Sequence, residues 1–441
     1  MARLFGTDGI RGIANEYPIN SEMGIVFGRA LVKFCNKKAL IITGRDTRIS
    51  GPMLESAVIS GILSWGGDVL SAEIIPTPGL AYLVKRFDAD AGVMISASHN
   101  PFEYNGFKPF YKGGEKLSED QEDHLETLII RPSKEKTDIG NLRPFPNAIL
   151  YYKDFLINTG LKDISFKDIK VVVDCANGAT YKVAPMVFEE LGVNATILFS
   201  EPNGKNINNK CGSQYPEILR AKVLETGANL GIAFDGDGDR LIAVDEKGDI
   251  LTGDHLIAIF SKMLKHLGIM KNPVVVTTVM SNIGLKLALE KMGIKHVSTK
   301  VGDRNVVKEM KNRGAILGGE ESGHIIFLNH HSTGDGIISA IQLLCAIKLF
   351  NKSLNELAHI MKSYPQIMLN VEVKQKPELS SIPEINSEIK KIEKELFPKG
   401  RILVRYSGTE PVCRIMVEGE DKDKIKNYAN QIAFLIKKRL G

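Results

Sequence analysis

The sequence predicts an α/β protein built of several domains. Its 441 residues are too many for one hydrophobic core, so we expect about three or four domains. Apolar residues make up 43% of the chain and charged residues 25%, as in ordinary globular proteins. Apolar runs rich in β-branched residues repeatedly end in polar, glycine-containing turns and give way to helical patterns. This succession is typical of the βα units of a mostly parallel sheet.

The N-terminal third contains the first group of these units. Apolar spacing predicts a helix over residues 23–34, and a second helix is expected to hold Pro52 in its first turn. Apolar, partly β-branched runs predict strands over residues 39–43, 69–75 and 91–95. The third of these strands ends in small and polar residues, which makes its carboxyl end a place where a ligand could bind.

The segment after this strand holds a turn signal and a lysine. Asn105-Gly106 is a dipeptide typical of turns, and a turn there would bring Lys108 back toward the strand end. Most lysines are ordinary surface residues. A lysine folded back toward a nucleophile could instead have a lowered pKa and act as an acid or base.

Two further α/β groups and a smaller unit follow. Strands are expected over residues 169–174 and 241–244 in the second group and over residues 274–278 in the third. The last segment has an α+β pattern, and its lysine-rich run 422–439 has the apolar spacing of a packed helix. The domains expected from these patterns, with an approach to a boundary over residues 131–148, are 1–150, 151–248, 249–366 and 367–441.

Composition argues against several classes of protein. The net charge of +5 comes without a long basic block, which suits an anionic small substrate better than nucleic acid. The five cysteines are scattered and lack CxxC spacing, so neither a disulfide framework nor a zinc site is expected. The chain has no leader-like N-terminus and no run of about eighteen apolar residues. We therefore expect a cytoplasmic protein that does not insert into a membrane.

Ser98 is the candidate nucleophile. It follows the apolar run 91–95 and precedes Asn100-Pro101, so its hydroxyl is expected at the carboxyl end of a buried strand. A serine hydroxyl is a weak nucleophile without help, so the chain must also supply charge stabilisation and a proton acceptor. A plain strand-to-turn connection with a capping serine is the alternative.

Asp235, Asp237 and Asp239 alternate with glycines after an apolar run. Like charges this close repel unless a cation lies among them, and carboxylate oxygens with a flexible loop suit Mg²⁺. An EF-hand would need glycine where Arg240 stands, so that reading fails. A phosphatase in which Asp235 carries the phosphoryl group remains the competing enzyme class.

Three other segments have residues suited to a phosphosugar. Arg11 lies between glycines and could place a bidentate cation over a phosphate. Glu320 and Ser322, in a glycine-rich turn, offer an acceptor and a donor for sugar hydroxyls. Two arginines flank a donor-rich loop that could cradle a phosphate, and the residues of this group are Arg405, Ser407, Gly408, Thr409 and Arg414. The chain has neither a Walker A string nor a dinucleotide fingerprint, which disfavours a nucleotide-using kinase or a dehydrogenase.

Six motifs occur in order along the chain: FGTDGIRG, GRDTRISG, ISASHNP, DGDGDR, GGEESGH and RYSGTEP. Each string alone is moderately informative, and all six in this order are highly specific. Through them the chain resembles the α-D-phosphohexomutase family over essentially its whole length, and most closely the bacterial members that act on glucosamine phosphates. The resemblance implies three α/β domains with mixed sheets and a smaller C-terminal α+β domain around a central cleft.

The resemblance also implies an activity, the interconversion of glucosamine 6-phosphate and glucosamine 1-phosphate through a phosphoserine and a glucosamine 1,6-bisphosphate intermediate. Mg²⁺ is the implied cofactor, and a homodimer is an assembly to be tested. The implied roles are Ser98 as the phosphoserine; Ser98, Asp235, Asp237 and Asp239 as metal ligands; Lys108 and His324 near the proton-transfer position; Arg11 and Arg240 beside the phosphoserine; Glu320 and Ser322 at the sugar; and Arg405, Ser407, Gly408, Thr409 and Arg414 at the substrate's own phosphate.

Two residues depart from the family pattern. Glu321 stands where glutamine is usual, and Tyr406 where lysine is common. Neither is a matched catalytic position, so both bear on substrate detail rather than on the reaction. Members acting on mannose or glucose phosphates remain an alternative. A non-catalytic phosphosugar-binding module would predict a missing nucleophile or a broken metal loop, and both are intact here.

Overall fold

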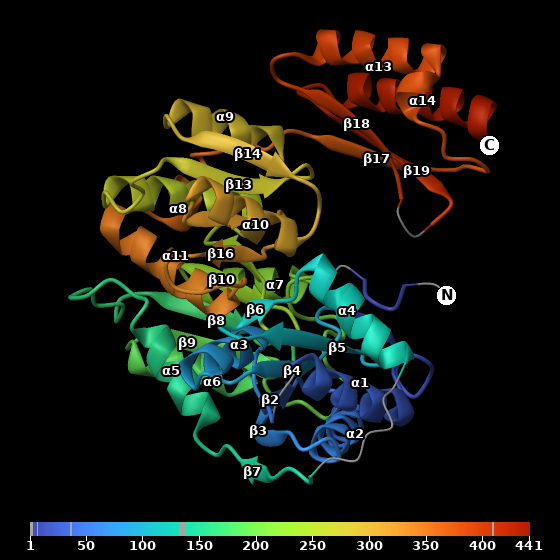
Figure 1. Ribbon diagram of the computed structural model, residues 1–441. Helices are drawn as coiled ribbons and strands as arrows, with labels where there is room; N and C mark the ends of the chain where they lie inside the picture. The colour runs from blue at the N-terminus through green and yellow to red at the C-terminus, as the bar shows by residue number, and fades with distance from the viewer. Residues whose placement is uncertain (1–2, 7, 36–37, 132–137, 408–409) are drawn as a thin grey trace. The chain divides into compact units, whose positions relative to one another are not determined.

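The computed structural model describes residues 3–6, 8–35, 38–131, 138–407 and 410–441. Contacts divide the chain into two compact units (Figure 1). Unit 1 comprises residues 1–280 and 294–360, and unit 2 comprises residues 281–293 and 361–441. Unit 1 contains three mixed sheets and unit 2 a small antiparallel sheet, so the fold class expected from the sequence is confirmed. The four domain boundaries stay a prediction.

The first sheet of unit 1 has the strand order β1-β5-β4-β2-β3-β7, with β6 paired to β5. Its central strands are parallel, and β5 runs antiparallel to β4. The strands are β1 (Ile10–Ile13), β2 (Leu40–Arg45), β3 (Asp68–Ile74), β4 (Ala91–Ile95), β5 (Tyr104–Tyr111), β6 (Glu115–Lys116) and β7 (Leu142–Pro144). The helices of this region are α1 (Ser21–Phe34), α2 (Gly51–Leu63), α3 (Thr77–Arg86), α4 (Glu119–Ile130) and α5 (Ala148–Ile157).

Two apolar clusters cover the two faces of this sheet. Val93 and Ile95 of β4 pack in a cluster with residues of α1, α2 and α4, whereas Met94 packs with residues of α3 and α5. The side chains alternate because successive residues of a strand point to opposite faces. Burial on both faces explains why the sequence of β4 is a continuous apolar run.

The expectation of a turn at Asn105-Gly106 is wrong. Both residues lie inside β5, where Gly106 pairs with Arg11 of β1. The side-chain amide of Asn105 donates to the Ser50 hydroxyl, and its carbonyl oxygen accepts the N–H of Gly106. The chain reverses direction earlier, between β4 and β5. Strand pairing on both sides outweighs the local turn preference, and it places Lys108 directly opposite Met94.

The second sheet has the order β12-β11-β10-β8-β9. Strands β9, β8 and β10 are parallel, while β11 is antiparallel to β10. Its elements are β8 (Lys170–Asp174), η1 (Ala179–Tyr181), α6 (Val183–Glu190), β9 (Asn194–Leu198), α7 (Glu217–Thr226), β10 (Leu230–Phe234), β11 (Leu241–Asp245) and β12 (Ile250–Leu251). The three aspartates therefore lie in the loop that joins β10 to β11.

The third sheet has the order β14-β13-β15-β16, with β16 antiparallel to β15. Its elements are α8 (Gly253–His266), β13 (Val274–Thr278), β14 (Lys295–Thr299), α10 (Asp303–Arg313), β15 (Leu317–Gly319), β16 (Ile325–Phe327), α11 (Gly336–Phe350) and α12 (Leu354–Ala358). The loop containing Glu320 and Ser322 connects β15 to β16. The carboxyl ends of β4, β10 and β15 thus carry three of the five motifs of unit 1, ISASHNP, DGDGDR and GGEESGH.

Unit 2 is a three-stranded antiparallel sheet in the order β17-β19-β18, packed against helices. Its elements are α9 (Ile283–Lys291), β17 (Gln366–Glu372), η2 (Leu379–Ser381), α13 (Pro383–Leu396), β18 (Arg401–Tyr406), β19 (Val412–Glu418) and α14 (Lys422–Leu440). Ile425, Ile432 and Ile436 of α14 are buried in its apolar cluster, as the spacing of the lysine-rich segment predicts.

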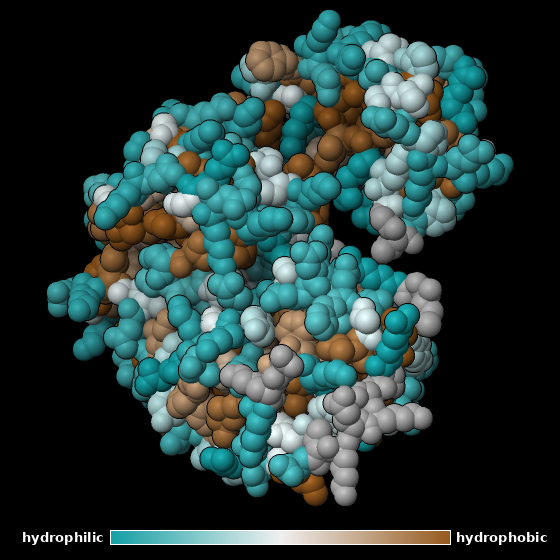
Figure 2. All heavy atoms as spheres, in the orientation of Figure 1, coloured by the Kyte–Doolittle hydropathy of each residue, from teal (hydrophilic) through white to brown (hydrophobic). Residues whose placement is uncertain are grey.

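Hydrophilic side chains cover most of the face of unit 1 in Figure 2, and apolar ones interrupt them in small groups. Within the described ranges, no helix combines the length and the apolar character needed to cross a membrane.

Candidate active site

Ser98 lies just beyond β4 and is almost completely buried. Its backbone φ of 54° is in the left-handed region, which costs a non-glycine residue about 1–2 kcal/mol. The hydroxyl donates a hydrogen bond to Asp235 Oδ2 at 2.6 Å and lies 3.3 Å from His99 Nδ1. The sequence therefore places its candidate nucleophile in contact with the first carboxylate of the aspartate loop.

Three side chains hold the backbone of Ser98 in this conformation. The Ser98 N–H donates to Ser96 Oγ at 3.0 Å. Its carbonyl oxygen accepts hydrogen bonds from Arg48 Nη2 at 2.8 Å and from Asn208 Nδ2 at 2.9 Å. Arg48 is fully buried and also donates to the carbonyl oxygens of Asn100 and Pro101. A guanidinium fork can bind several acceptors at once, so Arg48 fixes the whole turn after β4.

Close approach of two backbones requires glycine at residue 236. A Cβ added to Gly236 would lie 2.6 Å from the carbonyl oxygen of Ser98. Any side chain there would push the serine turn away from the aspartate loop. The first glycine of the DGDGDR motif is thus explained by the contact between the two loops.

Asp235, Asp237 and Asp239 form a buried group of carboxylates. One oxygen of each lies within 4.8 Å of the others. Burial, followed by repulsion from Asp239 and Asp237, raises the pKa of Asp235 well above its ordinary value. Such a cluster is unfavourable unless a cation shares it.

The free oxygens of this cluster suit a small divalent cation. Asp237 Oδ1 and Asp239 Oδ1 are buried without a hydrogen-bond partner among the described residues. Mg²⁺ binds carboxylate oxygens at about 2.0–2.1 Å, so opposite ligands lie about 4 Å apart. The donor set and its spacing fit a metal site.

Lys108 projects from β5 into the same cluster. Its Nζ lies 2.6 Å from Asp237 Oδ2 and 2.8 Å from Asp8 Oδ2. Burial would lower the pKa of Lys108, but Asp237 and Asp8 outweigh burial and raise it. The expectation of a lowered pKa for Lys108 is therefore wrong, because two carboxylates stabilise its ammonium form.

His324 lies beside the same carboxylates and is buried. Its Nδ1 is 3.5 Å from Asp239 Oδ2, and its Nε2 is 3.4 Å from Asp303 Oδ2. Burial would lower the pKa of His324, but Asp239 and Asp303 raise it to about 9. Nε2 also lies 3.1 Å from the Gly334 nitrogen. A neutral ring can accept from that N–H and a protonated ring can donate to Asp303, so both protonation states have a partner.

The two arginines of unit 1 that the sequence placed beside the phosphoserine, Arg11 and Arg240, border this cluster. Arg11 in β1 forms an ion pair with Asp8. The Arg240 Nε lies 3.8 Å from Asp239 Oδ1, and the Arg240 backbone N–H donates to Asp235 Oδ1 at 3.2 Å. Both side chains remain partly exposed, so each can turn toward an added phosphate.

The loop between β15 and β16 contacts the first residue of β11. The Leu241 N–H donates to the carbonyl oxygen of Gly323 at 3.0 Å, which ties this loop to the end of the aspartate loop. Glu320 Oε1 accepts the N–H of Gly302 at 3.0 Å. The Ser322 hydroxyl is buried without a hydrogen-bond partner in the described part of the chain. This loop, tied to the start of β11, thus carries one acceptor and one hydroxyl without a hydrogen-bond partner among the described residues.

The remaining predicted residues belong to unit 2. Arg405 of β18 stands directly opposite Arg414 of β19, so the two side chains share one face of the sheet. Arg414 Nη2 donates to Glu410 Oε2 at 2.6 Å, and Ser407 is buried at the start of the connecting loop. Gly408 and Thr409 lie outside the described residues. Paired guanidiniums next to a hydroxyl can bind a phosphate.

Several residues of the site were not identified from the sequence. Asp8 and Arg48 lie within FGTDGIRG and GRDTRISG, so the motifs contained them without indicating their partners. Asp303 follows Gly302 and is the first residue of α10. Asn208 and Lys116 lie outside the six motifs, and no local signal marks them. Their contacts arise between segments about 100 or more positions apart and appear only in the folded chain.

Comparisons with known proteins agree over the whole chain. The sequence matches the four domain families described as phosphoglucomutase/phosphomannomutase: alpha/beta/alpha domain I over residues 2–136, domain II over 150–248, domain III over 252–364 and the C-terminal domain over 368–434. It is 50% identical over 449 residues to a phosphoglucosamine mutase of Syntrophus aciditrophicus, covering all of both chains. A phosphoglucosamine mutase of Thermoanaerobacter pseudethanolicus is 48% identical, again over both full lengths.

Solved structures share the fold at lower identity. A phosphoglucomutase/phosphomannomutase family protein from Burkholderia thailandensis superposes with a TM-score of 0.82 at 24% identity, covering 99% of this chain and 98% of that one. The Aspergillus fumigatus N-acetylphosphoglucosamine mutase, solved with GlcNAc-6P and magnesium, gives a TM-score of 0.68 at 16% identity, covering 99% and 95% of the two chains.

Proposed function

The chain belongs to the phosphoglucomutase/phosphomannomutase family, and on that premise we propose that it interconverts glucosamine 6-phosphate and glucosamine 1-phosphate. The single observation that carries this proposal is the contact of Ser98 with a buried carboxylate cluster, flanked by Lys108 and His324. The substrate follows from full-length relatives that are named phosphoglucosamine mutase. Glu320 and Glu321 add negative charge near the proposed sugar loop, which suits an ammonium at C2 of the sugar.

The resting enzyme in this proposal carries a phosphoryl group on Ser98. Asp235, Asp237 and Asp239, together with the Ser98 phosphate, are the residues that would hold Mg²⁺, the ion named for the A. fumigatus structure. Bound Mg²⁺ supplies positive charge that offsets the charge developing on the transferring phosphoryl group. Arg11 and Arg240 contribute further positive charge from the edges of the cluster.

In the first half-reaction, the bond from phosphorus to Ser98 Oγ breaks. A bond forms to the free C1 hydroxyl oxygen of glucosamine 6-phosphate, giving glucosamine 1,6-bisphosphate. The sugar hydroxyl loses a proton, and Ser98 Oγ gains one. We assign these transfers to Lys108 and His324, because both lie at the carboxylate cluster and His324 has partners for both of its protonation states.

In the second half-reaction, the bisphosphate presents its other phosphoryl group to the serine. Ser98 Oγ loses its proton and bonds to that phosphorus, and the C6 oxygen leaves and gains a proton. Glucosamine 1-phosphate results, and Ser98 is phosphorylated again. We assign the sugar hydroxyls to Glu320 and Ser322, and the non-transferring phosphate to Arg405, Ser407, Gly408, Thr409 and Arg414.

No disulfide joins the cysteines among the described residues, which agrees with the proposed cytosolic location of this reaction. The test is a mutase assay on glucosamine, mannose and glucose 6-phosphates, each primed with the matching bisphosphate. We expect the highest kcat/KM on glucosamine 6-phosphate. Equal or higher kcat/KM on mannose 6-phosphate would contradict the substrate assignment, and release of inorganic phosphate without isomerisation would indicate the phosphatase alternative.

A further inference from the structure

Lys116 is a partly buried ammonium placed between two carboxylates. Its Nζ lies 2.6 Å from Asp8 Oδ1 and 2.5 Å from Asp303 Oδ2. Burial would lower the pKa of Lys116, but Asp303 and Asp8 raise it, so the side chain stays charged. Lys116 is at the end of the short strand β6, outside every motif recognised in the sequence.

Each of these carboxylates also holds one of the two proposed proton-transfer groups. Asp8 Oδ2 lies 2.8 Å from Lys108 Nζ, and Asp303 Oδ2 lies 3.4 Å from His324 Nε2. An unbroken series of ion pairs therefore runs Lys108, Asp8, Lys116, Asp303, His324. Its two ends meet the metal-site carboxylates Asp237 and Asp239.

We propose that Lys116 is a positioning residue for phosphoryl transfer, which sets the places of Lys108 and His324 through Asp8 and Asp303. This inference rests on the function proposed above. Lys116 itself touches none of Ser98, Asp235, Asp237 or Asp239 in the ion pairs and hydrogen bonds of the described residues.

The geometry shows why each carboxylate depends on Lys116. Asp303 Oδ2 is shared by Lys116 and His324, while Asp303 Oδ1 accepts the backbone N–H of Arg304. Lys116 thus fixes the oxygen that faces His324. Asp8 Oδ1 binds Lys116, whereas Asp8 Oδ2 binds both Lys108 and Arg11, so loss of Lys116 leaves Oδ1 without its cation and removes one of the three contacts that orient the Asp8 carboxylate.

Stability alone is a weak reason for such an arrangement. Burying ions is costly, and a buried ion pair often contributes little net stability compared with apolar residues. Ion pairs do impose a defined geometry. An error of about 1 Å in the place of a catalytic group can cost about a hundredfold in rate, so this geometry is valuable at a proton-transfer site.

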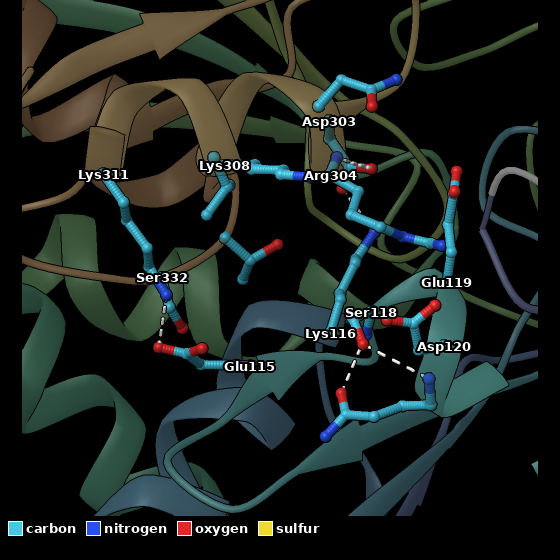
Figure 3. Close-up of a pocket in the computed structure, with 14 residues that line it drawn as sticks. Glu115, Lys116, Ser118, Glu119, Asp120, Asp303, Arg304, Lys308, Lys311 and Ser332 are labelled. Atoms are coloured by element: carbon cyan, nitrogen blue, oxygen red, sulfur yellow. Dashed lines mark hydrogen bonds and ion pairs between the residues drawn. The ribbon is translucent and has the colours of Figure 1, made fainter. Parts of the chain in front are cut away.

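A cavity of about 460 Å³ reaches Lys116. Figure 3 shows Lys116 and Asp303 on its wall, together with Arg304, Lys308 and Lys311. Ser98 and the three aspartates of the loop are not among its lining residues. The cavity gives room for a larger side chain at residue 116 and a route for a small amine.

The test compares Lys116→Met with wild type and with Lys311→Met. Lys311 lines the same cavity, but its ion pair is with the half-exposed Glu115, so its loss should leave kinetics unchanged. For Lys116→Met we expect kcat to fall about tenfold or more while KM changes by less than about threefold, because alignment rather than binding is lost. Mg²⁺ affinity, measured by calorimetry, should stay within about threefold of wild type.

Two further variants separate positioning from a structural role. Lys116→Arg keeps the charge and both hydrogen bonds and should recover most of the lost kcat, since the cavity can accept its bulk. For Lys116→Ala, added propylammonium should raise kcat, whereas tetramethylammonium, a cation without an N–H donor, should not. If Lys116→Met does not fold, Lys116→Gln is compared with wild type and with Lys311→Met in its place.

Wild-type kcat in Lys116→Met or Lys116→Gln would overturn the inference. So would equal losses in Lys116→Met and Lys311→Met, or loss of kcat together with Mg²⁺ affinity. An inactive wild type on all three sugar phosphates would instead refute the proposed function, so the two failures are distinguishable.

Discussion

The hydroxyl of Ser98 donates a 2.6 Å hydrogen bond to Asp235, which lies 137 positions later in the chain. The two residues lie in the loops that follow strands of different sheets, β4 and β10, and the close approach of Gly236 to the Ser98 carbonyl brings these loops together. Ser98 and Asp235 are also the two candidates for the residue that carries the phosphoryl group. The chemical stability of the phosphorylated residue distinguishes a phosphoserine from an aspartyl phosphate.

Ser98→Ala should lower mutase activity by several powers of ten, because the covalent route disappears with its nucleophile. The fold should persist, since one hydroxyl at a strand end contributes little to the core. Purified wild type should contain a phosphate monoester on Ser98 that survives acid and is lost in alkali. Peptide mass spectrometry locates it. A hydroxylamine-sensitive acyl phosphate on Asp235, with Ser98→Ala still active, would refute this mechanism.

Asp235→Asn should weaken Mg²⁺ binding by about tenfold or more, as measured by calorimetry, because one carboxylate ligand is lost. In EDTA the same variant should melt at or above the temperature of wild type. The reason is that burial and the neighbouring aspartates raise the pKa of Asp235, so its charged form destabilises the metal-free protein.

The difference in melting temperature between Asp235→Asn and wild type in EDTA should depend on pH in one direction. A raised carboxyl pKa means that the folded state loses stability as the pH rises from the ordinary carboxyl range through the raised value. The advantage of Asp235→Asn in EDTA should thus shrink as the pH is lowered toward that range. A variant that melts well below wild type at every pH, with and without EDTA, would show that the carboxylate is required for packing instead.

Arg48→Lys should reduce kcat by about tenfold or more, because an ammonium cannot replace the fork that holds the carbonyls of the Ser98 turn. Steady-state kinetics and a melting curve check this together. Arg45→Lys is the matched control, since Arg45 pairs with Glu55 and not with the turn. Equal kinetics for both variants would show that Arg48 does not position Ser98.

Arg414→Ala should lower kcat/KM about tenfold or more, because a charge-assisted hydrogen bond is worth about 1.5–3 kcal/mol. Mg²⁺ affinity without substrate should stay unchanged, as Arg414 lies in unit 2 and the aspartates in unit 1. Arg439→Ala, which removes the ion pair with Glu384 elsewhere in unit 2, should leave kcat/KM at the wild-type value. Unchanged kinetics of Arg414→Ala would place the phosphate elsewhere.

The sequence by itself determined the local elements and the chemistry at their ends. Strand β4 spans the run 91–95 as expected, and β13 spans 274–278, because continuous apolar and β-branched runs favour strands buried on both faces. The spacing of Asp235, Asp237 and Asp239 made a metal site predictable, since repulsion between near neighbours is a local property. The six motifs indicated the family for the same reason, because each is a short contiguous string.

Only the tertiary structure decided which side chains meet. Asn105-Gly106 has the local signature of a turn, yet pairing with β1 and β4 makes it strand. Lys108 has a raised pKa because Asp237 and Asp8 reach it from distant segments. Arg48 lies in a motif that does not indicate its partners, and Asn208 and Lys116 carry no local signal, since their roles depend on partners brought together from different sheets and loops. Periodicity and motif spacing report the preferences of neighbours along the chain, whereas pKa values and the placing of a nucleophile depend on charges close in space.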